Sequence, residues 1–127
     1  MADGSRSGLL KAAAAVRLLL SDVDGVLTDG GLLYFENGGE AKRFHVRDGL
    51  GLVLAREAGL LTGIVSGRAS AAADRRAREL AMDEIHLGGA DKVAVLDAIL
   101  EKRGLRADQV CFVGDDLNDL GVLRRVG

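Results

Sequence analysis

The sequence of 127 residues predicts a single α/β domain, a Rossmann-like parallel sheet flanked by helices. Two observations indicate this fold class. Short apolar runs, typical of buried parallel strands, alternate with longer helix-favouring segments. Several of these runs end abruptly in polar residues, as in Asp22-Val23-Asp24-Gly25. The length suits one domain, since domains commonly hold about 100 to 150 residues.

The first predicted strand is the apolar run from Val16 to Leu20, which leads directly into the two aspartates. We expect residues 1–15 to form a polar leader with a short helix over Leu9–Ala15. Lys11 and Arg17 interrupt the apolar pattern that a signal peptide would need. Residues 16–127 are then the predicted domain.

A β-hairpin is predicted over residues 31–46, because Asn37-Gly38 lies between two runs of β-favouring residues. It interrupts the alternation of strands and helices, so we expect it to project from the sheet as a flap. An isolated hairpin is only marginally stable in water, and its apolar side chains need a surface. That surface is either the hairpin's own domain or other subunits. The apolar side chains are Leu32, Leu33, Tyr34, Phe35, Phe44 and Val46.

The remaining chain keeps the alternation that the fold class requires. Glycines at 59 and 104 are expected to end helices, and Asp91 is the expected N-cap of the helix that follows it. The predicted helices cover Leu50–Ala58, Ala69–Met82, Lys92–Arg103 and Asp119–Arg125. The predicted strands cover Leu60–Val65, Glu84–Leu87 and Val110–Val113.

Composition excludes several classes of function. The formal net charge of −2 offers no electrostatic attraction to nucleic acid or to an anionic membrane. No apolar run approaches the length of a membrane span, so a cytoplasmic location follows by default. The one cysteine, Cys111, cannot form an internal disulfide, and we expect an inert core thiol.

The polar strand ends suggest a chemistry when they are taken together. An Asp-x-Asp alone is more often a turn or a cap. Here, however, Asp22 and Asp115 follow strands whose carboxyl ends share one edge, and two such carboxylates could hold Mg²⁺. Ser66 and Lys92 could hold a phosphoryl group. Asp22 is then a candidate nucleophile that forms an aspartyl-phosphate, and Asp24 a candidate acid and base.

The residues in this order resemble the four motifs of the haloacid dehalogenase superfamily. The motifs are Asp22-Val23-Asp24-Gly25-Val26, Ser66, Lys92 and Gly114-Asp115-Asp116-Leu117-Asn118-Asp119. Within the superfamily, the chain is similar to the small phosphatases, without a cap domain, that act on 3-deoxy-D-manno-octulosonate 8-phosphate. Residues 24–30, 44–49 and 66–68 carry this narrower resemblance, and the hairpin is in the family's position.

The resemblance implies a role for each matching residue. Asp22 is the nucleophile and a Mg²⁺ ligand, Asp24 is the acid and base and a ligand through its backbone carbonyl, and Asp115 is the third protein ligand. Ser66 and Lys92 bind the phosphoryl group. Two further acidic residues orient these ligands or hold metal-bound waters, namely Asp116 and Asp119.

The resemblance also implies a homotetramer whose hairpins gather at its centre, and a role in lipopolysaccharide biosynthesis. Arg47 and Arg68 are candidates for binding the substrate carboxylate, since a guanidinium can bind it with two hydrogen bonds. For either arginine the alternative is a surface or intersubunit salt bridge. Family members normally continue beyond the last motif with a strand, a helix and a tail, so we expect the C-terminal part of the usual fold to be absent.

Other functions stay open. The close alternatives are a phosphatase for a nine-carbon keto acid 9-phosphate and a domain related to acylneuraminate-activating enzymes. A receiver-like signalling module also combines clustered acids with a lysine, but Lys92 precedes the second acidic cluster here, which argues against it. The last alternative is a catalytically inactive oligomerisation scaffold.

Overall fold

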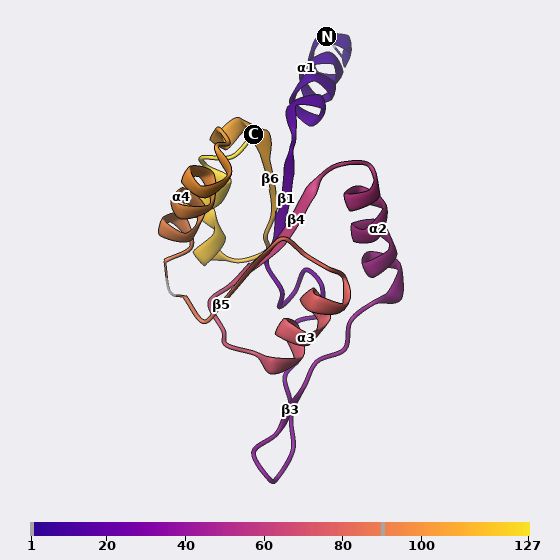
Figure 1. The fold of residues 1–127 in the computed structure, drawn as a ribbon, viewed down its shortest axis with the longest axis vertical. Coiled ribbons are helices and arrows are strands. Elements are labelled where there is room, and N and C mark those ends of the chain that lie inside the picture. Colours follow the sequence, from indigo (N-terminus) through magenta and orange to yellow (C-terminus); the bar gives the residue numbers. More distant parts are fainter. Residues whose placement is uncertain (1, 90) are drawn as a thin grey trace.

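Helices cover both faces of a four-stranded parallel sheet in the computed structural model, which describes residues 2–89 and 91–127 (Figure 1). The strand order is β5-β4-β1-β6, and all neighbours pair in parallel. The predicted fold class is therefore confirmed, and the four carboxyl ends lie at one edge of the sheet. The strands are β1 (Leu18–Ser21), β4 (Leu61–Ser66), β5 (Glu84–Leu87) and β6 (Val110–Val113).

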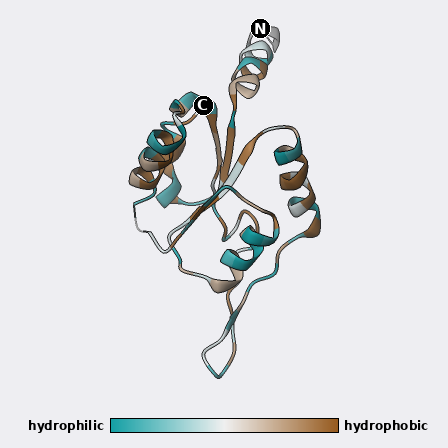
Figure 2. Ribbon diagram, viewed as in Figure 1, coloured by the Kyte–Doolittle hydropathy of each residue, from teal (hydrophilic) through white to brown (hydrophobic). Residues whose placement is uncertain are grey.

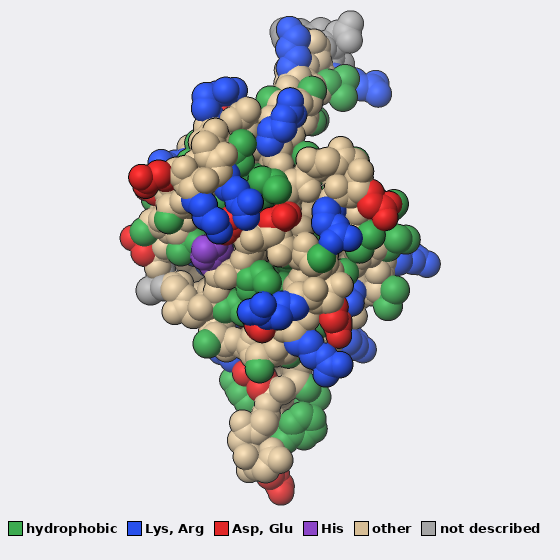
Figure 3. All heavy atoms as spheres, in the orientation of Figure 1, with side chains coloured by type: hydrophobic (Ala, Val, Ile, Leu, Met, Phe, Trp, Pro, Cys, Tyr) green, Lys and Arg blue, Asp and Glu red, His purple; other side chains and the backbone are tan. Residues whose placement is uncertain are grey.

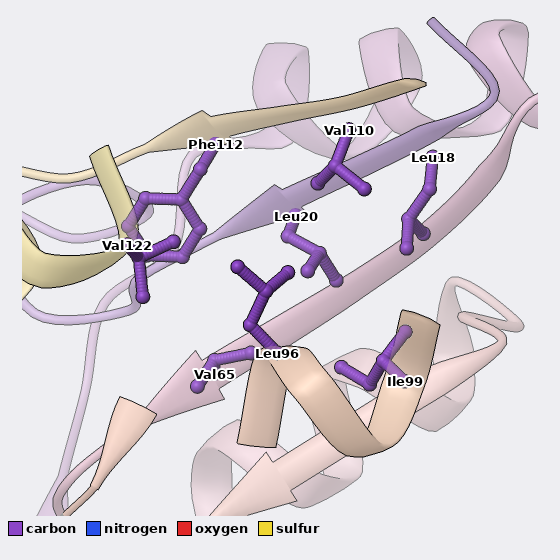
Figure 4. Close-up of a cluster of buried hydrophobic side chains, with 8 residues drawn as sticks. All are labelled: Leu18, Leu20, Val65, Leu96, Ile99, Val110, Phe112 and Val122. Carbon is purple, nitrogen blue, oxygen red and sulfur yellow. The ribbon is translucent and has the colours of Figure 1, made fainter. Parts of the chain in front are cut away.

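Two hydrophobic cores hold the helices to the sheet, whose central strands are largely apolar (Figure 2). Helices α2 (Val46–Glu57) and α3 (Ala71–Glu79) supply one core, which contains Leu52 and Ala77. Helices α4 (Lys92–Arg103) and α5 (Leu120–Leu123) supply the other, where side chains from five elements interdigitate (Figure 4). Its buried members are Leu18, Leu20, Val65, Leu96, Ile99, Val110, Phe112 and Val122.

The N-terminal region is more helical than the sequence suggested. Helix α1 spans Ala2–Ala15 and projects away from the sheet, with Leu9 and Leu10 exposed (Figure 1). The prediction of a polar leader with a helix beginning at Leu9 is wrong in extent, and Met1 lies outside the described residues. The division between residues 1–15 and the domain at 16–127 stays a prediction.

Helix α2 begins at Val46, four residues before the predicted start, so Val46 belongs to the helix and not to the hairpin, and Arg47 lies on the first turn of the helix. His45 is its N-cap, and the imidazole accepts a hydrogen bond from the N–H of Arg47 at 3.1 Å. The glycines near the start of the segment lower helix propensity, which hid the true boundary. Gly49 packs tightly, since an added Cβ there would contact the side chain of Arg76.

Two other predicted helices, α3 and the last one, also have different boundaries in the structure. Helix α3 begins two residues later than predicted, because Ser70 caps it by accepting a hydrogen bond from the N–H of Ala73 at 3.1 Å. It ends at Glu79, before Ala81, whose φ of +50° is not helical. The predicted last helix, Asp119–Arg125, is shorter in the structure, where α5 follows a 3₁₀ turn, η2 (Leu117–Asp119). Another 3₁₀ turn, η1 (Ala107–Gln109), precedes β6. Asp91 and Gly104 cap α4 as expected. Cys111 is partly buried on β6.

The hairpin is confirmed, although its strands are short: β2 (Leu33–Tyr34) pairs antiparallel with β3 (Glu40–Ala41) around the Asn37-Gly38 turn. It projects from the same end of the sheet as the strands' carboxyl ends (Figure 1). Hydrophobic side chains gather over it at the lower end of the molecule in Figure 3. Four of them are between 47% and 61% exposed, so the domain leaves about half of each residue uncovered: Leu32, Leu33, Tyr34 and Phe35.

No helix within the described residues is long and apolar enough to cross a membrane.

Candidate active site

Three carboxylates meet where β1 and β6 end. Asp22 follows β1, and its N–H donates to the carbonyl oxygen of Val113, the last residue of β6, at 2.9 Å. The loop after β6 brings Asp115 to the same place, and η2 brings Asp119. One oxygen from each carboxylate lies within 4.8 Å of the others. The arrangement matches the oxygen ligands that Mg²⁺ prefers.

Lys92, the first residue of α4, is buried beside this cluster. Its Nζ lies 2.6 Å from Oδ1 of Asp119 and 3.2 Å from Oδ1 of Asp22. Three carboxylates and one ammonium leave a net charge of −2, which a divalent cation would neutralise. Burial raises the pKa of Asp22 above its ordinary value, while the N–H of Val23 and the Lys92 ammonium act in the opposite direction. The donor set and the charge therefore both fit a divalent metal.

Asp119 organises the loop that carries Asp115. Its side chain is fully buried, and its Oδ2 accepts hydrogen bonds from the N–H groups of Asp115 and Asp116 at 3.0 and 3.2 Å. Asp116 itself is exposed and caps η2 by accepting from the N–H of Leu117. The sequence predicted the same role for Asp116 and Asp119. In the structure, Asp119 is a buried carboxylate that organises the loop, and Asp116 is an exposed N-cap.

Gly25 brings the loop after β1 directly against the cluster. Its φ of +85° belongs to the left-handed region that glycine adopts freely. A Cβ at this position would overlap the carboxylate of Asp115. The close approach therefore requires a residue without a side chain.

The predicted strand ends line one cleft of about 330 Å³. Ser66 lies at the end of β4 with its Oγ accepting a hydrogen bond from the N–H of Arg68 at 3.3 Å. Lys92 is not part of the lining. Arg47 is exposed on the first turn of α2 and does not line the cleft either, so the role of Arg47 in binding substrate stays a prediction. The lining residues are Asp22, Asp24, Ser66, Gly67, Arg68, Asp115, Asp116 and Asn118.

The sequence did not identify the hairpin as part of this site. The Nζ of Lys42 lies 2.5 Å from Oδ1 of Asp24 and 3.1 Å from Oε1 of Glu40. Arg68 reaches the same group, with Nη2 3.3 Å from Glu40 and 3.4 Å from the hydroxyl of Tyr34. Strand alternation is the sequence signal that could have identified the hairpin as part of the site, since Glu40 and Lys42 are two residues apart and share a face.

No protein-family model matches the chain. Over 112 residues, or 88% of its length, it is 38% identical to the 3-deoxy-D-manno-octulosonate 8-phosphate phosphatase KdsC of Haemophilus influenzae. The match spans 62% of that relative. The chain therefore covers less than two thirds of the curated relatives that it matches.

Solved structures agree with this relationship. The 3-deoxy-D-manno-octulosonate 8-phosphate phosphatase of Moraxella catarrhalis, crystallised with a magnesium ion, a phosphate ion and KDO, is 40% identical with a TM-score of 0.90. The match covers 92% of this chain and 67% of that one. A protein of Legionella pneumophila, described as a HAD superfamily (subfamily III A) hydrolase, is 36% identical with a TM-score of 0.95, over 99% of this chain and 69% of that one.

Proposed function

Because the chain belongs to the haloacid dehalogenase superfamily, and within it to the family of 3-deoxy-D-manno-octulosonate 8-phosphate phosphatases, we propose that it is a Mg²⁺-dependent phosphatase. Its proposed substrate is a phosphorylated keto sugar acid, most simply 3-deoxy-D-manno-octulosonate 8-phosphate. The observation that carries the proposal is the convergence of Asp22, Asp115 and Asp119 within 4.8 Å beside the buried Lys92.

In the proposed reaction, the Asp22 carboxylate attacks phosphorus and the bond to the leaving oxygen breaks, which leaves an aspartyl-phosphate. Asp24 donates a proton to the leaving oxygen and then accepts one from the water that attacks the intermediate. The Ser66 hydroxyl and the Lys92 ammonium bind the phosphoryl oxygens. Arg68 and Arg47 are the proposed partners of the sugar acid carboxylate, and Arg68 is the one that lines the cleft.

Mg²⁺ is the proposed cofactor, because the clustered carboxylates carry a net negative charge and offer only hard oxygen ligands. The carboxylates of Asp22 and Asp115 and the backbone carbonyl of Asp24 would hold it. When bound, the ion neutralises charge on the carboxylates and on the phosphoryl group. Asp119 fixes the loop that presents Asp115, and Asp116 is proposed to hold metal-bound water.

The test is phosphate release from the eight-carbon 8-phosphate and from a nine-carbon keto acid 9-phosphate, with and without Mg²⁺. We expect Mg²⁺-dependent turnover and a higher kcat/KM for the eight-carbon substrate. Asp22→Asn should lower the rate by ~10³-fold or more. The matched control is Asp108→Asn, because Asp108 is an exposed aspartate that pairs with Arg106 away from the cleft.

Each other outcome points to a different function. A preference for the nine-carbon substrate would reassign the specificity. A stable phospho-aspartate without turnover would indicate a receiver-like module. No release from any substrate would indicate an inactive scaffold, and full activity in Asp22→Asn would remove the proposed nucleophile.

We also propose that the hairpin assembles the chain into a homotetramer. The support is the exposure of Leu32, Leu33, Tyr34 and Phe35 on a hairpin that has little surface of its own to cover them. Sedimentation velocity should show a tetramer for the wild type and a smaller species for Leu33→Glu. A monomeric wild type would contradict the assembly. A cytoplasmic location and a role in lipopolysaccharide biosynthesis are parts of the same proposal.

A further inference from the structure

We propose that Lys42, the residue that follows β3, is a positioning residue that holds the Asp24 carboxylate for proton transfer. The inference rests on the proposed function, in which Asp24 is the acid and base. It assigns the hairpin a part in the chemistry in addition to its part in assembly.

The burial of Lys42 is the first support. Its side chain is 1% exposed, whereas the side chain of the next residue, Arg43, is 88% exposed. A buried ammonium is costly unless it is paired and hydrogen-bonded. Lys42 meets this requirement through Asp24 at 2.5 Å and Glu40 at 3.1 Å. A side chain of this length could reach water instead, so the buried position indicates a specific pairing.

The geometry of the pair is the second support. Lys42 contacts Oδ1 of Asp24, while Oδ2 lies on the side of Arg68, whose Nε is 3.8 Å away. Asp24 and Arg68 line the cleft and Lys42 does not. The ammonium therefore holds Oδ1 on the side away from the cleft. Oδ2 stays on the cleft side, where it can serve the leaving group. A carboxylate fixed in this way avoids the loss of rate that a small misplacement causes.

The balance of charge is the third support. Lys42 and Arg68 provide two positive charges, and Asp24 and Glu40 provide two negative ones, so the group is neutral as a whole. Within the described residues, the ion pairs of Lys42 are those with Asp24 and Glu40. Neither side chain belongs to the carboxylate cluster around Asp22, and Asp24 is proposed to hold the metal through its backbone carbonyl, which Lys42 does not contact. Removal of the Lys42 charge should consequently disturb proton transfer and leave Mg²⁺ binding intact.

The experiment compares Lys42→Met with Arg43→Met on two substrates. An alkyl phosphate has a poor leaving group that needs a proton, whereas p-nitrophenyl phosphate has a good leaving group that does not. General acid catalysis contributes about 10²- to 10⁴-fold. We expect Lys42→Met to lower kcat/KM, which reports the step in which the leaving group departs, by about 100-fold for the alkyl phosphate and by less than about tenfold for the aryl phosphate. The Kd for Mg²⁺, measured by calorimetry, should stay the same, and Arg43→Met should match the wild type.

A double-mutant cycle with Asp24→Asn guards against a simple loss of folding. The pair Asp24→Asn/Lys42→Met removes both charges of the Lys42–Asp24 pair, while Glu40 keeps its ion pair with Arg68. The double variant should be no slower on the alkyl phosphate than Asp24→Asn alone. Equal losses on both substrates, weaker Mg²⁺ binding, or a multiplicative loss in the double variant would overturn the role of Lys42. A wild-type chain that releases no phosphate in Mg²⁺ overturns both proposals, because a positioning residue needs a reaction to position.

Discussion

Replacement of Asp119 by asparagine is the most direct probe of how the site is built. Asp119 accepts hydrogen bonds on both oxygens, from Lys92 on Oδ1 and from the N–H groups of Asp115 and Asp116 on Oδ2. An amide has one acceptor oxygen, and its NH₂ group is a donor. In either orientation, Asp119→Asn therefore sets a donor against a donor in a fully buried place.

The size of the effect follows from the loss of a buried partner. Breaking a buried ion pair by removing one member costs about 3–5 kcal/mol. For a chain between the size classes of about 100 and 150 residues, 1 kcal/mol lowers Tm by about 3–4 °C. We expect Asp119→Asn to unfold about 9–20 °C below the wild type. The matched control, Asp116→Asn, keeps an acceptor oxygen for the exposed cap, and asparagine caps about as well as aspartate, so it should unfold within about 3 °C of the wild type.

The assay is thermal unfolding followed by circular dichroism, with a chelator present so that metal binding does not contribute. Each variant is then titrated with Mg²⁺. Asp119→Asn should also bind Mg²⁺ more weakly, because the loop that presents Asp115 loses its anchor. A variant that unfolds within about 3 °C of the wild type and binds Mg²⁺ equally well would refute an organising role for Asp119.

Three further perturbations test other parts of the structure. Gly25→Ala should weaken Mg²⁺ binding in calorimetry, because the added methyl overlaps Asp115 and the left-handed backbone costs a further ~1 kcal/mol; unchanged affinity would contradict the close approach. Burial raises the pKa of Glu84, but hydrogen bonds from His86 and Arg103 outweigh it and leave that pKa below 4.5. Because the folded-state pKa is lowered, ionised Glu84 stabilises the fold above pH 4.5, and this contribution is lost as the pH falls through the folded-state value. Glu84→Gln should therefore be less stable by about 2 kcal/mol at pH 7, the size of a hydrogen bond to a charged group, and equal to the wild type in acid; a difference that persists in acid would contradict it. Mg²⁺ at 100 times its Kd should add about 2.7 kcal/mol to the free energy of unfolding, and the same concentration should add almost nothing in Asp115→Asn.

The sequence predicts the strands well because their signal is local. Each strand is a short apolar run that ends at a polar residue, and Asp22, Ser66 and Asp115 could be assigned to one edge from parallel topology alone. Helix boundaries are harder, because α2 opens with an unusual N-cap, His45, and contains two glycines near its start. Tertiary packing against β4, and not intrinsic propensity, decides that helix.

Two features of the site could not be predicted from the sequence pattern. Nothing in the spacing of Asp116 and Asp119 indicates which one turns inward, because that depends on how η2 folds over the loop. The pairing of Lys42 with Asp24 depends on the orientation of the hairpin relative to the sheet. No local sequence pattern predicts that orientation. Contacts between distant segments set both features, so they emerge only from the folded structure.

The position of β1 between β4 and β6 bears on how the protein is made. Leu18 pairs with Leu61 on one side and with Val110 on the other, so the second pairing closes a loop that contains most of the chain. Contacts this remote in sequence form slowly, because the loop entropy is lost before they contribute. During synthesis, a half with β1, β4 and β5 can collapse early, whereas the carboxylates contributed by the β6 loop arrive late. The affinity for metal should therefore develop after the bulk of the chain has compacted, and metal binding would report the final step of folding.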